Sequence, residues 1–436
     1  MFSCKRPFDR ILQGIWNDFN TICKIKSNTR AGLSVPVPAV CPRRGRGRTG
    51  FSNAGLSRRI GWAEDCNRKG RVPIHPEQPA VPGQAAEACG HFLCYRSMAP
   101  YTAAAFLQEA GGRVEASARF ERAAGDGPDA SRSVWCLSVR LYTGQGPLDL
   151  LGAHLPIFPV RDAVKFPRAL RALSGGADSL WRFVAENPEA FPFAVWYFSD
   201  LGTVGSLRHI RAYGSQTCLW RGPEGVHIVR FHWIPVAGEQ CLSRREAARR
   251  SALEPACVRR DFHDTLALGR TVDFDLCVQL MTPEEGAALP FDPLDPTKIW
   301  DELRFPLLPV GRLMLERKAA PGETVVDFAP TRLPPGFAIA PGRPPLCWTR
   351  PAPLGREVPV RPAGPRRGAD GFVQAGERYR CLPAREKAAL IDNMAASLAV
   401  EPTSVRRCVI GYARQADENF GEALAAQIPA YRIEPA

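Results

Sequence analysis

The chain has 436 residues and a net charge of +13, with 45% hydrophobic and 23% charged residues. These proportions are typical of a globular protein, and the length suits one large domain or two ordinary ones. No stretch approaches the ~18 uninterrupted apolar residues of a membrane helix, and charged residues interrupt any apolar run near the N-terminus. The sequence therefore predicts no membrane segment and a cytoplasmic location.

Residues 1–66 are basic and lack any sustained periodicity, which predicts a disordered segment. The run of arginines and glycines at 42–48 could attract phosphate groups. No aromatic residues interleave with it, so a nucleic-acid partner is not predicted. The 14 cysteines include no C-x-x-C pair, and only His91 lies between Cys89 and Cys94. This spacing predicts no structural zinc site.

From about residue 100 the hydrophobic pattern becomes regular and predicts both strands and helices. The predicted elements are a short helical segment at 103–108, strands at 114–119, 134–141 and 148–158, helices at 162–173 and 179–186, strands at 207–220 and 226–234 joined by a turn at 222–225, helices at 243–253 and 257–268, and strands at 272–281 and 310–316. Because the helices are inserted among the strands and do not alternate strictly with them, the pattern favours an α+β fold with a barrel-like sheet.

Prolines recur throughout residues 318–371. Such a segment can form neither a central strand nor a helix, so it predicts an extended wrap across a surface or a linker. Beyond it, apolar residues between 390 and 398 share one helical face, and Phe420, Leu424 and Ile428 repeat the spacing. The chain is therefore predicted to end in a small helical layer.

A series of ordered sequence blocks resembles the haem catalase family. The blocks are DLLGAHLPIF at 149–158, RDAVKFP at 161–167, FSDLG at 198–202, RHIRAYGSQT at 208–217, VRFHW at 229–233, FDPLDPTKIW at 291–300, PVGRLML at 309–315 and QAGERYR at 374–380. They follow the family's order over roughly residues 100–430, and the chain is identified as a member on that basis.

The resemblance implies a division of the chain into five parts. These are an atypical basic N-terminal segment at 1–66, a divergent N-terminal arm at 67–98, a catalase-like antiparallel β-barrel core with inserted helices at 99–317, a Pro-rich wrapping segment at 318–371 and a C-terminal helical segment at 372–436. It also implies bound haem, hydrogen peroxide as a substrate that is converted to water and oxygen, and a homo-oligomer, either a tetramer or a dimer.

In the family, a distal His and Asn act on the peroxide and a proximal Tyr phenolate binds the iron. The matching positions here hold Pro82 for the His, Ala153 for the Asn and Leu354 for the Tyr. A second alignment register places Cys347 at the iron-ligand position. In neither register is the ligand a tyrosine, because none occurs between residues 213 and 379.

Other positions of the haem site match the family. The resemblance implies haem contacts for Arg119, which matches an arginine that binds a propionate, and for Phe158, Phe166, Arg350 and Arg361.

Two histidines are candidates to replace the distal His. His75 lies seven residues before Pro82, and His154 follows Ala153 directly. Strand alternation, however, sends the side chains of neighbours to opposite faces.

The substitutions predict a catalase-family haem protein that is weakly active or inactive, in effect a pseudoenzyme. Two alternatives stay open. One is a haem peroxidase that works with substitute residues, and the other is a non-enzymatic binding protein whose basic arm engages a partner.

Overall fold

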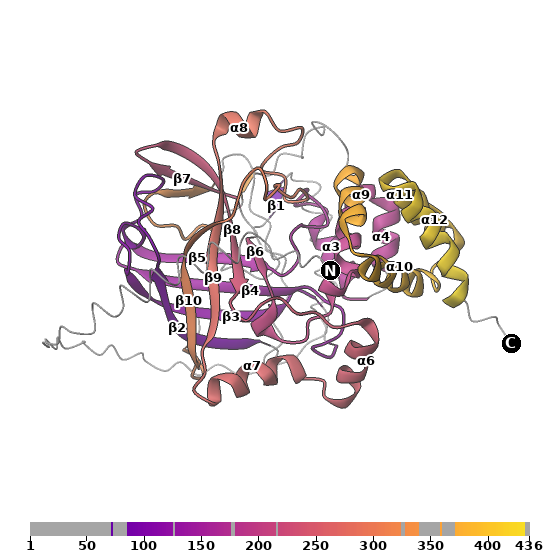
Figure 1. Ribbon diagram of the computed structural model, residues 1–436, viewed down its shortest axis with the longest axis horizontal. Helices are drawn as coiled ribbons and strands as arrows, with labels where there is room; N and C mark the ends of the chain where they lie inside the picture. The colour runs from indigo at the N-terminus through magenta and orange to yellow at the C-terminus, as the bar shows by residue number, and fades with distance from the viewer. Residues whose placement is uncertain are drawn as a thin grey trace, which may run out of the picture. The chain divides into compact units, whose positions relative to one another are not determined.

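The centre of the fold is a closed barrel of antiparallel strands (Figure 1). The computed structural model describes residues 71–72, 85–124, 127–175, 179–214, 217–323, 328–339, 358–359 and 371–431. These residues belong to one unit of the chain, Ser57–Ala436. Every helix among them is too short or too polar to span a bilayer.

Within these residues the barrel closes because β8 pairs with β6 on one side and with β9 on the other. The ring runs in the order β8 (Gly225–Pro235), β6 (Ala212–Gly214), β5 (Gly146–Ala153), β4 (Trp135–Thr143), β3 (Arg113–Arg122), β2 (Ala86–Cys94), β10 (Leu308–Lys318) and β9 (Val272–Met281). Strands β7 (Cys218–Gly222) and β11 (Phe337–Ile339) extend the sheet beyond β8, and β1 (Arg71–Val72) pairs separately with β12 (Val358–Pro359).

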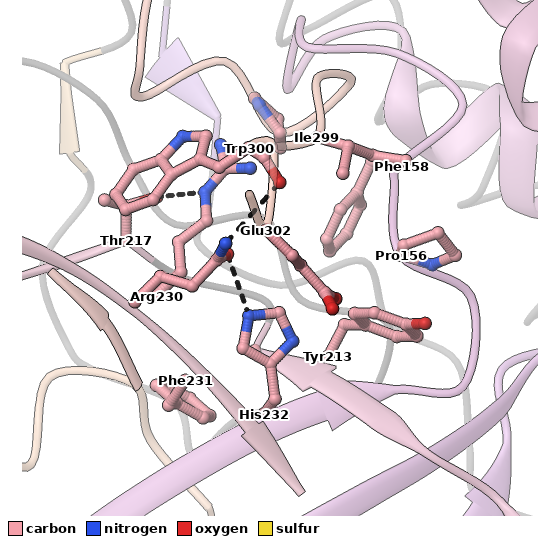
Figure 2. A pocket seen from close by; sticks show the side chains of 13 residues that line it. Pro156, Phe158, Tyr213, Thr217, Arg230, Phe231, His232, Ile299, Trp300 and Glu302 are labelled. Carbon is pink, nitrogen blue, oxygen red and sulfur yellow. Dashed lines mark hydrogen bonds between the residues drawn. The ribbon is translucent and has the colours of Figure 1, made fainter. Parts of the chain in front are cut away.

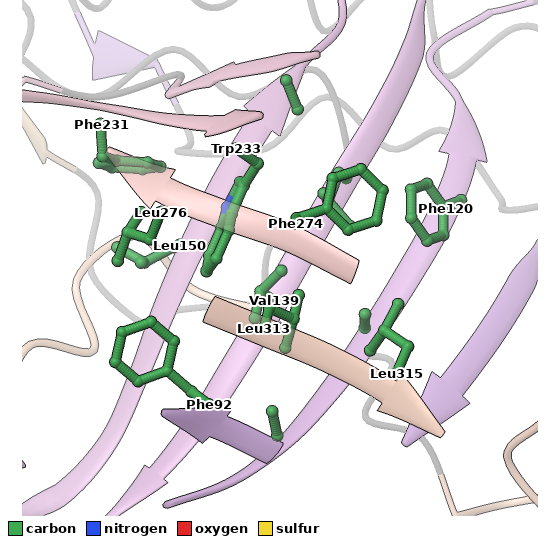
Figure 3. Packing of buried hydrophobic residues seen from close by; sticks show 14 of the residues in the cluster. Phe92, Phe120, Val139, Leu150, Phe231, Trp233, Phe274, Leu276, Leu313 and Leu315 are labelled. Atoms are coloured by element: carbon green, nitrogen blue, oxygen red, sulfur yellow. The ribbon is translucent and has the colours of Figure 1, made fainter. Parts of the chain in front are cut away.

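The barrel is filled by the inward-facing half of each strand, because side chains alternate across a pleated sheet. On β3, Ala116, Ala118 and Phe120 are buried in this core, and Figure 3 shows Phe120, Trp233 and Phe274 converging in it. Strands β2 and β10 approach closely at Gly90, where a Cβ atom would lie 1.9 Å from the Met314 carbonyl oxygen. Only glycine fits there.

Helices of two regions of the chain form a second core. The first group is α3 (Phe166–Leu173), α4 (Leu180–Glu186) and α5 (Phe191–Phe198), and the second is α9 (Phe372–Cys381), α10 (Ala384–Leu398), α11 (Thr403–Ala416) and α12 (Glu418–Gln427). The Trp181 Nε1–H donates to Ser397 Oγ at 2.8 Å, and Asn393 Nδ2 donates to the Phe198 carbonyl at 3.0 Å. These bonds tie the groups together, as the proximity of α4 and α11 in Figure 1 illustrates.

Within the described ranges, the remaining helices are connections between the larger elements. They are η1 (Ala105–Leu107), η2 (Pro188–Ala190), η3 (Asp200–Gly202), η4 (Leu207–His209), α6 (Arg244–Leu253), α7 (Cys257–Ala267), α8 (Pro283–Ala287) and η5 (Ile428–Tyr431).

The predicted α+β barrel is confirmed, but some element boundaries differ. The barrel already includes β2, which lies in the range 67–98 assigned to an arm. The predicted strand at 207–220 is divided into η4, β6 and β7. The strand predicted at 148–158 ends at Ala153, shortly before Pro156, whose ring cannot donate to a ladder.

Candidate functional site

The outer face of strands β2 to β5 carries several of the predicted site residues. Because Ala116, Ala118 and Phe120 face the barrel core, Arg119 faces outward. Its cross-strand partners are Glu87 on β2 and Ser138 on β4. Ala153 at the end of β5 also faces outward, since Leu148 and Leu150 are the inward residues of that strand. The fold therefore places Arg119 and Ala153 on one face.

Arg119 is held by two carboxylates. Its Nη1 donates to Glu87 Oε1 at 2.5 Å, and its Nε donates to Glu121 Oε2 at 3.2 Å. The Arg119 side chain is only 11% exposed. Burial raises the pKa of Glu121, although Arg119 acts in the opposite direction. The guanidinium is therefore already matched by charges of its own sheet.

Ala153 provides only a buried methyl group at the position of the distal amide. It belongs to the cluster of buried apolar residues that includes Val134, Leu155 and Phe158. A methyl group can neither donate nor accept a hydrogen bond.

His154 points away from this face and is bonded through both ring nitrogens. The backbone N–H of Trp135 donates to Nδ1 at 3.0 Å, and Nε2 lies 2.9 Å from the Leu201 carbonyl oxygen. These partners fit a neutral ring protonated on Nε2. Burial lowers the pKa of His154 to about 4. Its chemistry is that of a buried structural histidine.

Phe158 and Phe166 lie together at the start of the helical region. Their ring centroids are 5.5 Å apart, and both side chains are buried in the helical core. The other predicted site residues lie outside the described residues: Pro82, His75, Leu354, Cys347, Arg350 and Arg361. The part of the chain that is described contains no group of three or more His, Cys, Asp or Glu side chains that could hold a metal ion.

Sequence reasoning missed a buried charge network centred on Asp149. This carboxylate is 0% exposed and accepts from Arg140 Nε at 2.6 Å and Arg140 Nη2 at 2.7 Å. It also accepts from Arg332 and from the Ala329 backbone N–H. Arg140 covers the ring of Phe328, which packs against Leu151. The segment around residue 329 is thereby fastened to the outer face.

A small pocket lies between β8 and the loop that leads to β10 (Figure 2). Its cavity of about 40 Å³ suits a few water molecules. Arg230 donates to three backbone carbonyls of that loop and lies 4.6 Å from the Trp300 ring centroid. Burial lowers the pKa of His232, and Glu302 pairs with Arg211 at 2.6 Å. Glu302 is paired with an arginine, and Arg230 is bonded to backbone carbonyls, so these charged groups of the pocket hold the loop in place.

The comparisons with known proteins identify the family. A family model described as Catalase matches residues 71–343, and one described as Catalase-related immune-responsive matches residues 365–428. The chain belongs to the catalase family.

Among its relatives, it is 29% identical over 435 residues to a bromoperoxidase-catalase of Streptomyces venezuelae, covering 82% of this chain and 90% of that protein. It is 36% identical over 257 residues to a catalase of Listeria innocua, covering 57% of this chain and 52% of that protein. The chain thus spans most of the first relative and about half of the second.

Solved structures agree with the fold. A bacterial catalase has a TM-score of 0.73 at 23% identity and covers 94% of this chain and 98% of its own. Catalase A from Saccharomyces cerevisiae has a TM-score of 0.71 at 21% identity, with coverages of 90% and 97%. The family resemblance and the barrel are therefore confirmed.

The described residues do not fit haem in the way that the family resemblance implies. The arginine expected to bind a propionate is already paired with Glu87 and Glu121. The position expected to hold the distal amide carries the methyl group of Ala153, and both ring nitrogens of His154 have backbone partners. The donor set on this face is thus unsuited to the cofactor.

Proposed function

We propose that this catalase-family protein is weakly active or inactive in the conversion of hydrogen peroxide to water and oxygen. The observation that carries the proposal is the buried methyl group of Ala153 on the outer face of the barrel. Peroxide chemistry needs positioned groups that hydrogen-bond the substrate and move its proton. Ala153 can do neither.

The adjacent histidine does not supply the missing chemistry. To accept a proton at Nδ1, His154 would have to give up the hydrogen bond from the Trp135 N–H. Its depressed pKa, about 4, also disfavours the imidazolium near neutral pH. A proton relay through His154 would therefore work against its surroundings.

The proximal side supports the same proposal. No tyrosine occurs between residues 213 and 379, so neither Leu354 nor Cys347 can supply the phenolate that the family uses. Haem is the cofactor expected from the family, and we propose that this chain does not hold it in the family's manner. By analogy with the family, we further propose a homo-oligomer, a tetramer or a dimer, and a cytoplasmic location.

The test is an absorption spectrum of the purified full chain, with and without added hemin, together with oxygen release from hydrogen peroxide. The catalase of Listeria innocua at equal haem content is the positive control. We expect oxygen release on the order of 10² to 10⁴ times slower than in the control, which is the usual contribution of positioned acid and base groups. A Soret band accompanied by oxygen release within about tenfold of the control would overturn the proposal.

A further inference from the structure

Arg119 faces two carboxylates that come from its own sheet. Glu87 is its direct cross-strand neighbour, and Glu121 lies two residues along β3 on the same face. The Glu87 and Glu121 side chains are 26% and 18% exposed, so water screens this cluster weakly. Arg119 thus donates to two partly buried carboxylates.

Both carboxyl groups carry a negative charge beside Arg119 when they are ionised. Burial is the main cause of the raised pKa of Glu121; Arg119 lowers this pKa, and the charge of Glu87 adds a smaller rise. A further anion brought to Arg119 would meet like charges at short range in a poorly screened place. To bond the Nη1 or Nε donors that Arg119 now uses, it would have to displace one of the carboxylates.

The rest of this face is suited to an amphipathic anion. The Ser138 hydroxyl, opposite Arg119 on β4, is buried and has no hydrogen-bond partner among the described residues. Leu151 and Ala153 add buried apolar surface on the same side of β5. The face thus presents a cation, a hydroxyl group and apolar side chains on neighbouring strands. The negative charges of Glu87 and Glu121 disfavour the binding of an anionic ligand there.

We propose that Glu87 and Glu121 form a carboxylate block that keeps haem, through its two propionates, from using Arg119 as an anchor. The inference rests on the proposed function and deepens it, because it names the residues that exclude the cofactor. Once both carboxylates are neutralised, Arg119 and Ser138 are free to donate to a propionate.

The test is a Soret-band titration of the full chain with hemin and with hemin dimethyl ester, whose propionates carry no charge. The double variant Glu87→Gln/Glu121→Ser is compared with the wild type. Glu115→Gln is the matched control, because Glu115 lies on the same strand and its cross-strand partner on β4 is Tyr142, away from Arg119. We expect the double variant to bind hemin at least about tenfold more tightly than the wild type, the effect of removing one charge conflict of about 1.4 kcal/mol.

The control variant should bind hemin as the wild type does, and the ester should bind the wild type and the double variant within about twofold of each other. Equal hemin affinities for the wild type and the double variant, including no detectable binding by either, would overturn the block. If the double variant fails to fold, the comparison of the two ligands on the wild-type protein tests the proposal. The wild type must then bind hemin dimethyl ester at least about tenfold more tightly than it binds hemin, and equal affinities for the two ligands refute the block.

The two proposals fail in different ways. Rapid oxygen release by the hemin-loaded wild type contradicts the proposed function. Equal hemin affinities without oxygen release contradict only the carboxylate block.

Discussion

Protonation of His154 should destabilise the fold as the pH falls. The pKa of this buried ring is about 4, against 6.5 for an ordinary histidine. Between these values the unfolded chain takes up a proton that the folded chain does not, so the free energy of unfolding decreases with falling pH. At 1.36 kcal/mol for each unit of pKa, the loss between pH 6.5 and pH 4 approaches about 3 kcal/mol.

The variant His154→Asn isolates this contribution. The Asn Oδ1 can take the place of Nδ1 as acceptor for the Trp135 N–H, but it does not titrate. Because the Leu201 carbonyl loses its partner, we expect the variant to be less stable than the wild type by about 1–3 kcal/mol near pH 7.5. The difference should shrink by up to about 3 kcal/mol as the pH approaches 4, because the wild type loses the contribution of His154 there and the variant has no such contribution to lose.

Urea unfolding at several pH values between about 7.5 and 4 measures both quantities. His209→Asn is the control, since His209 is partly exposed and its ring lies 2.8 Å from the Gly238 carbonyl oxygen through Nδ1. Parallel stability curves for the wild type and His154→Asn would refute the reasoning. They would mean that the ring is not held neutral by its surroundings.

Three further predictions concern the outer face of the barrel. Asp149→Asn removes the buried carboxylate that pairs with Arg140, so it should lower the free energy of unfolding by about 3–5 kcal/mol in urea titrations, whereas Arg414→Ala in an exposed pair should change it by less than about 0.5 kcal/mol. Glu121→Gln should gain stability relative to the wild type as the pH rises from about 4 to 7, because burial raises the pKa of Glu121 and ionisation destabilises the wild type over that range; the opposite trend would count against it. Ala153→Asn buries an unpaired amide and should cost about 1–3 kcal/mol in urea unfolding. It should leave oxygen release unchanged within about tenfold, since the proximal tyrosine is still missing, and a larger rise would contradict this account.

Much of the barrel could be predicted from the sequence, because alternation follows directly from the pleat. The strand predicted at 272–281 coincides with β9, and that at 134–141 lies within one or two residues of β4. The first strand of the barrel was missed because β2 combines small residues with Gly90, which weakens the alternation. Helix α5 was missed for the opposite reason: its residues are nearly all apolar and buried, so no amphipathic period marks it.

The family resemblance located Arg119 and Ala153, but it could not reveal what surrounds them. Glu87 and Arg119 are 32 residues apart, and they meet only because of the register between β2 and β3. A slip of one residue would send Glu87 into the barrel core. The link between Asp149 and Ala329 spans 180 residues and depends on where the chain returns to the sheet. Such partners are set by tertiary structure.

The alternation of side chains along a strand predicted that His154 and Ala153 point in opposite directions. The hydrogen bonds of the His154 ring show what holds it in that orientation. The ring of His154 is bonded between the backbones of Trp135 and Leu201, which joins β4 to η3. Turning the ring toward Arg119 would orphan both backbone groups in a buried place, at about 1–3 kcal/mol each. The hydrogen bonds of His154 to the backbone therefore fix the orientation of its ring. Although His154 lies next to Ala153, it does not replace the distal residues of the family.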